Sequence, residues 1–213
     1  MIICFIISVI LSFIFSIVDC YIVYQRIKKK NIVFYFLFSI IVSSLFIVFE
    51  RLVSHSNDLF SVLIVIVLVS ISIVDHYLMI IPDSYNIFIG ITSLVKIIYC
   101  VLQKQPQMFY GKWDLISGLS ITILLMLITY FISKKKEIMG FGDLKLLLSI
   151  VIMIGLINQL LVLFVSCLVA VVVEVVVFHL KRKMIPFGPY LAFGIMIVIL
   201  FQPLIRKYIN LLI

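Results

Sequence analysis

Met-Gly-Phe-Gly-Asp-Leu-Lys-Leu-Leu, residues 139–147, is the stretch around which the chain is organised, because it places a carboxylate at the head of an apolar helix. An ionisable group beside hydrocarbon is costly, which makes Asp143 a candidate functional residue. Gly140 and Gly142 give it a flexible approach free of side chains, and a helix N-terminus favours negative charge. Carboxylates that do chemistry often work in pairs, and Asp75, after an apolar run, is the candidate partner.

The composition excludes an ordinary soluble domain. Hydrophobic residues make up 65% of the 213 residues and charged residues 12%, whereas soluble domains are about 45–50% apolar. The net charge of +8 does not indicate nucleic-acid binding, because the basic residues form short clusters between apolar runs. Positive-inside topology accounts for such clusters. The sequence therefore predicts a polytopic membrane protein.

The cysteines and the first residues exclude two further classes. The four cysteines lie far apart and form no C-x-x-C pair, which argues against a zinc ribbon or a disulfide framework. The N-terminus lacks a basic region ahead of its apolar stretch, unlike a cleaved signal peptide. We expect Met1 to Tyr24 to remain as the first span.

Apolar runs of about 20 residues predict eight membrane-spanning helices. We expect an all-α fold that forms a single membrane domain over residues 1–213, since open sheets cannot sit in hydrocarbon. The expected cores are residues 1–24, 32–49, 59–81, 86–102, 115–132, 144–157, 160–180 and 190–205.

The distribution of Lys and Arg predicts the orientation. Eleven of the seventeen basic residues fall in the odd-numbered connections, in clusters at 26–30, 134–145 and 181–183. The positive-inside bias then places both termini outside and the odd connections in the cytoplasm. Asp75 and Asp143 consequently lie on the same, cytoplasmic side.

The two aspartates predict an aspartyl protease. Pro82 ends the helix that begins at residue 59; if the helix runs to residue 81, Asp75 lies about 9 Å inside it. Two adjacent carboxylates do not both ionise easily, so one holds a proton while the other activates water. We expect Asp143, with the helix N-terminus and Lys145, to be the more readily ionised partner. The competing reading is structural, with Asp143 an N-cap and Asp75 an interfacial residue.

Three blocks of the sequence resemble the type IV prepilin peptidases. The first is Asp75 followed by Ile-Pro-Asp at 81–83, and the second is the stretch 139–147, with Asp143 at the family's second catalytic position. The third is Ile-Pro-Phe-Gly-Pro-Tyr-Leu-Ala-Phe-Gly at 185–194. Together they extend the resemblance over residues 60–213.

The resemblance implies an eight-span enzyme of the bacterial cytoplasmic membrane. Such enzymes cleave a basic leader after a Gly, on the cytoplasmic side, ahead of the single apolar helix of a pilin or pseudopilin precursor. Cleavage needs no cofactor, whereas many members also methylate the new N-terminus with S-adenosylmethionine and carry a domain with two C-x-x-C pairs. Only residues 25–31 separate the first two predicted spans here, which leaves no room for that domain and puts methylation in doubt.

Five further positions have open roles. Asp83 either orients basic residues of a leader or caps the next helix. Pro186 and Gly188 predict a rigid turn, which by resemblance lies near the active site. Lys96 and Glu174 are deeply placed charges. They either form a buried pair, or Glu174 makes a polar contact that lines the cavity and Lys96 extends towards the far interface.

Two alternatives compete with this function. Presenilin-type proteases also use Gly-x-Gly-Asp, but they carry a Tyr-Asp pair and a Pro-Ala-Leu motif, both absent here. The chain is otherwise a transporter or a secretion scaffold, with Asp75 and Asp143 as relay or assembly residues. Asp→Glu substitution separates these, since a relay tolerates it better than a catalytic pair.

Overall fold

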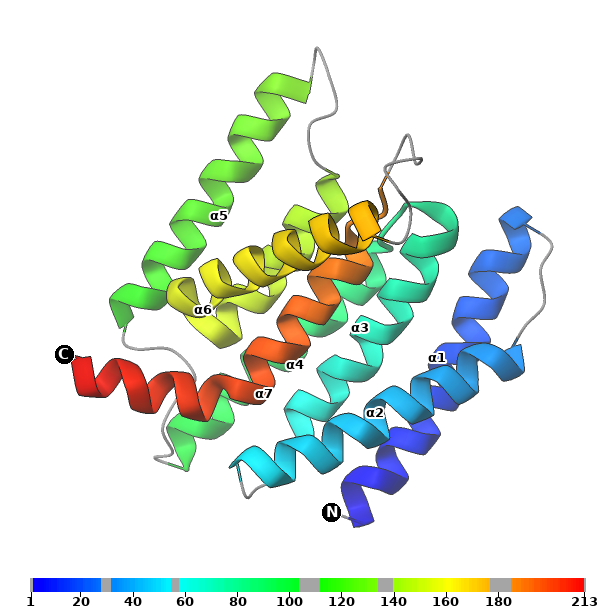
Figure 1. Ribbon diagram of the computed structural model, residues 1–213, viewed down its shortest axis with the longest axis horizontal. Coiled ribbons are helices and arrows are strands. Elements are labelled where there is room, and N and C mark those ends of the chain that lie inside the picture. The colour runs from blue at the N-terminus through cyan, green and yellow to red at the C-terminus, as the bar shows by residue number, and fades with distance from the viewer. Residues whose placement is uncertain are drawn as a thin grey trace.

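The computed structural model describes residues 2–27, 32–54, 58–103, 112–133, 140–176 and 185–212. All regular structure in these ranges is α-helical, and each helix is long and apolar enough to cross a membrane. The predicted all-α, polytopic membrane fold is therefore confirmed. Figure 1 shows the helices, which are α1 (Ile2–Ile27), α2 (Ile32–Ser54), α3 (Leu59–Leu78), α4 (Asp83–Leu102), α5 (Lys112–Ser133), α6 (Phe141–Val176) and α7 (Gly188–Leu212).

The described residues form seven helices where the sequence predicts eight spans, and the difference lies in α6. Its 36 residues correspond to about 54 Å at 1.5 Å per residue, well beyond a hydrocarbon core of about 30 Å. Gly155, with φ 75° and ψ −179°, interrupts the helix, and Figure 1 shows the chain folding back there. The helix thus has two legs, residues 141–154 and 156–176. The first predicted span, 144–157, runs past the break, and the second, 160–180, lies on the second leg as far as residue 176, where the described range ends.

Helix α3 is the centre of the bundle. It contacts α1, α2, α4 and α7, and every residue from 64 to 71 is buried. Figure 1 shows it between the α1–α2 pair and the other helices. Its sequence is apolar on all sides, as expected for a helix that neighbours surround.

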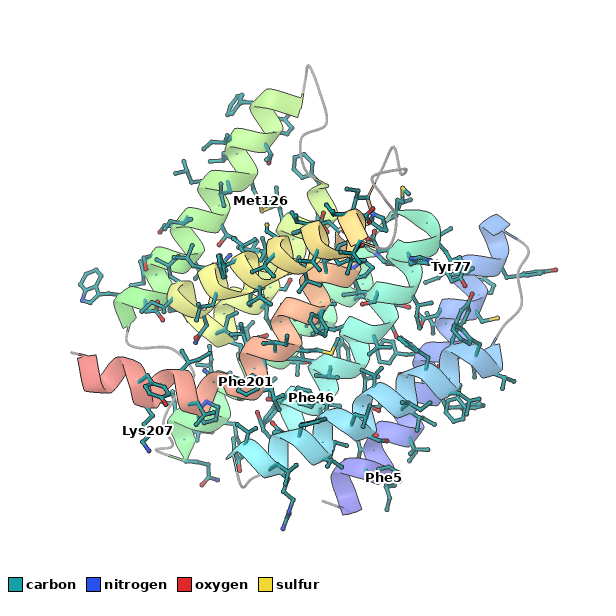
Figure 2. The ribbon with its side chains drawn as sticks, viewed as in Figure 1. Phe5, Phe46, Tyr77, Met126, Phe201 and Lys207 are labelled. Atoms are coloured by element: carbon teal, nitrogen blue, oxygen red, sulfur yellow. The ribbon has the colours of Figure 1, made fainter. Side chains whose placement is uncertain are left out.

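The outer surface of the bundle is apolar. Phe5 on α1 is 45% exposed whereas Phe46 on α2 is 6% exposed, and Figure 2 shows Phe5 at the periphery. A soluble protein rarely exposes apolar surface on this scale, so the pattern fits contact with lipid.

Candidate active site

Asp75 lies in the last turn of α3. The helix ends at Leu78, where Met79 takes the left-handed conformation (φ 54°) and its N–H donates to the Asp75 carbonyl at 2.8 Å. The expected continuation to residue 81 is therefore wrong. Asp75 is three residues from the helix end, or about 4.5 Å at 1.5 Å per residue, rather than about 9 Å. This smaller depth brings its carboxylate close to the connection that leads to α4.

Asp143 lies in the first turn of α6, as predicted. The two glycines before it keep this turn compact: a Cβ on Gly140 would be 3.0 Å from Asp143 Oδ2, and one on Gly142 would be 3.0 Å from Ile81 Cβ. Asp143 is the third residue of the helix, so it does not occupy the N-cap position that the structural reading assigned to it.

The two carboxylates line one cavity of about 310 Å³. Asp75 is 5% exposed and Asp143 is 8% exposed, and they are close enough for their charges to interact. The other lining residues come from the α3–α4 connection and the first turns of α4 and α6: Met79, Ile80, Ile81, Asp83, Gly140, Phe141, Gly142 and Lys145. Residues 75 and 143, 68 positions apart in sequence, therefore share a pocket large enough for a peptide group and a water molecule.

A third element reaches this site through the start of α7. The Gly188 N–H donates to Asp75 Oδ2 at 2.9 Å. The approach requires glycine, because a Cβ at this position would lie 2.7 Å from the same oxygen. Pro186 is buried just before it. The predicted turn therefore contacts one of the two aspartates directly.

Lys145 and Asp83 form an ion pair at the edge of the cavity. Lys145 Nζ lies 2.7 Å from Asp83 Oδ1, and both side chains are substantially exposed. Lys145 lines the same cavity as Asp143, and the expected support of Asp143 by Lys145 stays a prediction. Pro82 occupies the N-cap of α4 and Asp83 is the first helical residue, so Asp83 is not the cap considered as its alternative role.

A family model described as the type IV leader peptidase family matches residues 62–176, more than half of the chain. The chain belongs to the type IV leader peptidase family. It is accordingly a membrane-embedded peptidase, a hydrolase whose family acts on prepilins. Neither the curated proteins nor the solved structures include a match.

The matched range of this leader peptidase contains Asp75, Asp143 and the residues between them. It ends before the third block at 185–194, yet the structure brings Gly188 of that block onto Asp75. The contact thus joins the matched region to a segment outside it.

The expected pair of Lys96 and Glu174 is wrong. Lys96 forms an ion pair with Asp58, the N-cap residue at the opposite end of α3 from Asp75. Glu174 instead accepts a hydrogen bond from the Tyr190 hydroxyl at 2.8 Å. Depth along a helix was the only basis for the pairing, and depth does not specify which neighbouring helix a side chain faces.

Sequence reasoning placed Gly188 near the site but missed its N–H as the group that contacts Asp75. A signal was available, because a glycine beside Pro189 at the start of an apolar helix offers a free N–H in its first turn. The sequence did not predict that Asp75 accepts this N–H. Asp75 lies 113 residues away.

Proposed function

We propose that this family member is an aspartyl endopeptidase in which Asp75 and Asp143 activate water. One observation carries the proposal: both carboxylates are buried in a single cavity at the end of an apolar bundle. Buried acidic groups this close together are costly, and a structural role does not require two of them facing one pocket.

The proposed chemistry starts with one carboxyl group protonated and the other ionised. The ionised carboxylate removes a proton from water as the water oxygen attacks the scissile carbonyl carbon. The protonated carboxyl group donates its proton to the carbonyl oxygen, which gives a neutral gem-diol. Collapse of the gem-diol breaks the C–N bond. The leaving nitrogen takes the proton that the first carboxylate removed from water, and one hydroxyl proton of the gem-diol passes to the other carboxylate, which restores the starting state of the pair.

Asp75 Oδ2 is the proposed unprotonated oxygen. It accepts the Gly188 N–H, so a proton on this oxygen would have to lie away from that donor. We place the shared proton on another oxygen of the pair. With the proton on Asp75 Oδ1, this agrees with the assignment by sequence, in which Asp143 is the more readily ionised partner.

The proposed substrate is a pilin-like or pseudopilin-like precursor with a basic leader that ends in Gly, followed by one apolar helix. The proposed location is the bacterial cytoplasmic membrane, with the cavity facing the cytoplasm. Peptide hydrolysis then uses two carboxylates and water without a cofactor. S-adenosylmethionine enters only if the chain also methylates the product.

Co-expression with such a precursor tests the proposal. We expect wild type to shorten the precursor, and Asp75→Asn and Asp143→Asn each to leave it intact, because an amide cannot take part in the proton transfers. Asp114→Asn is the matched control. Asp114 is on α5, away from the cavity, where Oδ1 accepts the Ile157 N–H at 3.1 Å, a bond that an amide oxygen also accepts.

The outcomes separate the functions considered. Cleavage by either cavity variant at the wild-type rate contradicts the aspartyl mechanism. Retention of function in Asp→Glu variants but not in Asp→Asn variants favours a proton relay instead. For a cleaved product, the mass of its N-terminal peptide decides whether a methyl group is added.

A further inference from the structure

Glu174 is a buried carboxylate that the proposed chemistry does not use. It is 3% exposed, lies near the end of the second leg of α6, and is not among the residues that line the cavity. Its Oε1 accepts the Tyr190 hydroxyl at 2.8 Å. Its Oε2 is buried with no hydrogen-bond partner within the described residues. The hydrogen bond from Tyr190 therefore offsets much of the free-energy cost of burying the Glu174 carboxylate.

Tyr190 lies in the first turn of α7, two residues after the glycine that contacts Asp75. The backbone bond from the Leu191 N–H to the Phe187 carbonyl, at 2.9 Å, begins the helix. The Gly188 N–H precedes the first N–H with an acceptor inside the helix and is free to reach Asp75. The orientation of this turn thus decides whether that N–H points at Asp75 Oδ2.

The Tyr190–Glu174 bond fixes that turn against α6. We propose that Glu174 and Tyr190 are positioning residues, whose hydrogen bond holds the start of α7 so that the Gly188 N–H orients Asp75. The effect on cleavage rests on the proposed function, because it requires Asp75 to be catalytic. The structural link from Glu174 to Gly188 does not.

The arrangement also connects the two carboxylates of the site. The first leg of α6 carries Asp143, and the second leg holds the turn of α7 that contacts Asp75. The broken helix α6 therefore positions both aspartates: it carries Asp143 itself, and it holds the turn of α7 that contacts Asp75.

Kinetics of purified variants test the catalytic effect. We expect Tyr190→Phe to lower kcat about tenfold or more with KM within about twofold, because a displacement of about an ångström is costly in the transition state. Glu174→Leu should lower kcat by a similar factor. The double variant should lose no more of kcat than either single variant, because both substitutions remove the same hydrogen bond. Glu174→Gln should retain most of kcat, because the amide oxygen still accepts from Tyr190 and the amide nitrogen replaces the unpartnered Oε2.

Tyr85→Phe is the matched control. The Tyr85 hydroxyl donates to the buried Asp19 carboxylate at 2.5 Å, which joins α4 to α1 instead of α7 to α6. Removing it deletes the same kind of buried bond. We expect a comparable loss of thermal stability but a smaller change in kcat than in Tyr190→Phe.

A nuclear magnetic resonance readout tests the structural link without any substrate. Labelling with ¹³C-carbonyl phenylalanine and ¹⁵N-glycine selects the glycines that follow a phenylalanine, which are Gly142, Gly188 and Gly194. Phe187→Leu identifies the Gly188 signal by removing its coupling. We expect that signal to shift in Tyr190→Phe and Asp75→Asn and to stay in place in Tyr85→Phe and Glu174→Gln.

An unmoved Gly188 signal in Tyr190→Phe overturns the inference, as does a wild-type kcat in that variant. Equal losses of kcat in Tyr85→Phe and Tyr190→Phe also overturn it, since they indicate general destabilisation. If Asp75→Asn cleaves like wild type, the proposed function has failed instead, and the Gly188 signal alone then decides the structural link.

Discussion

At the scale of single residues, a backbone N–H closely approaches a buried carboxylate of the candidate site. Both aspartates were predictable, because an acidic residue within an apolar stretch stands out in the sequence. The donor to Asp75 was not, since it comes from a segment that only tertiary packing brings near. Lys145 shows the same limit, because its ion pair with Asp83, 62 residues away, was not predicted from its position in the sequence.

Gly188→Ala should abolish most of the activity. The added Cβ would lie 2.7 Å from Asp75 Oδ2 and 2.9 Å from its Cγ, so the carboxylate or the turn must move. A displacement of this size should lower kcat/KM about 100-fold. Gly90→Ala is the control, because a Cβ there has Ser149 Oγ at 3.8 Å as its nearest neighbour. Near-wild-type activity in Gly188→Ala would contradict the close approach.

At the scale of helices, the sequence predicted where apolar segments lie better than where they end. Pro82 suggested that α3 stops at residue 81, yet the helix ends at Leu78 with Met79 in a left-handed conformation that non-glycine residues adopt rarely. The predicted spans 144–157 and 160–180 leave Asn158 and Gln159 between them. Both are buried within the second leg of α6, and the break lies earlier, at Gly155.

The break depends on glycine and on the neighbouring helix. Gly155 has φ 75° and ψ −179°, a region almost closed to other residues. Close by, α5 packs tightly against the turn, where a Cβ on Gly118 would be 3.0 Å from the Leu156 nitrogen. Asp114 on the same helix accepts the Ile157 N–H and so serves as a cap for the second leg. These contacts are tertiary, which explains why sequence patterns missed the position.

Gly155→Ala should destabilise the protein by about 1–3 kcal/mol through backbone strain. The measurement is thermal or denaturant unfolding in detergent, compared with Gly90→Ala in the regular part of α4. In that control, alanine should stabilise by about 0.5–1 kcal/mol, since glycine is unfavourable inside a helix. Equal effects of the two substitutions would show that the break tolerates a side chain.

At the scale of the whole molecule, the distribution of basic residues predicts that the cavity faces the cytoplasm. The structure places the elements that form the cavity at one end of the bundle: the last turn of α3 and the first turns of α4, α6 and α7. Asp58 and Lys96 pair at the other end of α3. The basic clusters at 28–30, 134–136 and 181–183 lie outside the described residues, so the orientation stays a prediction from charge.

Accessibility of two introduced cysteines tests this orientation. Ile80 lines the cavity and is 44% exposed, whereas Leu102 ends α4 at its far end and is 76% exposed. In a variant whose four native cysteines are replaced by alanine, an impermeant maleimide on intact spheroplasts should label Leu102→Cys and spare Ile80→Cys. Permeabilisation should expose both, because α4 spans the membrane between them. Labelling of Ile80→Cys alone in intact spheroplasts would reverse the topology and place cleavage on the outer side, where a leader that remains in the cytoplasm does not reach the carboxylates.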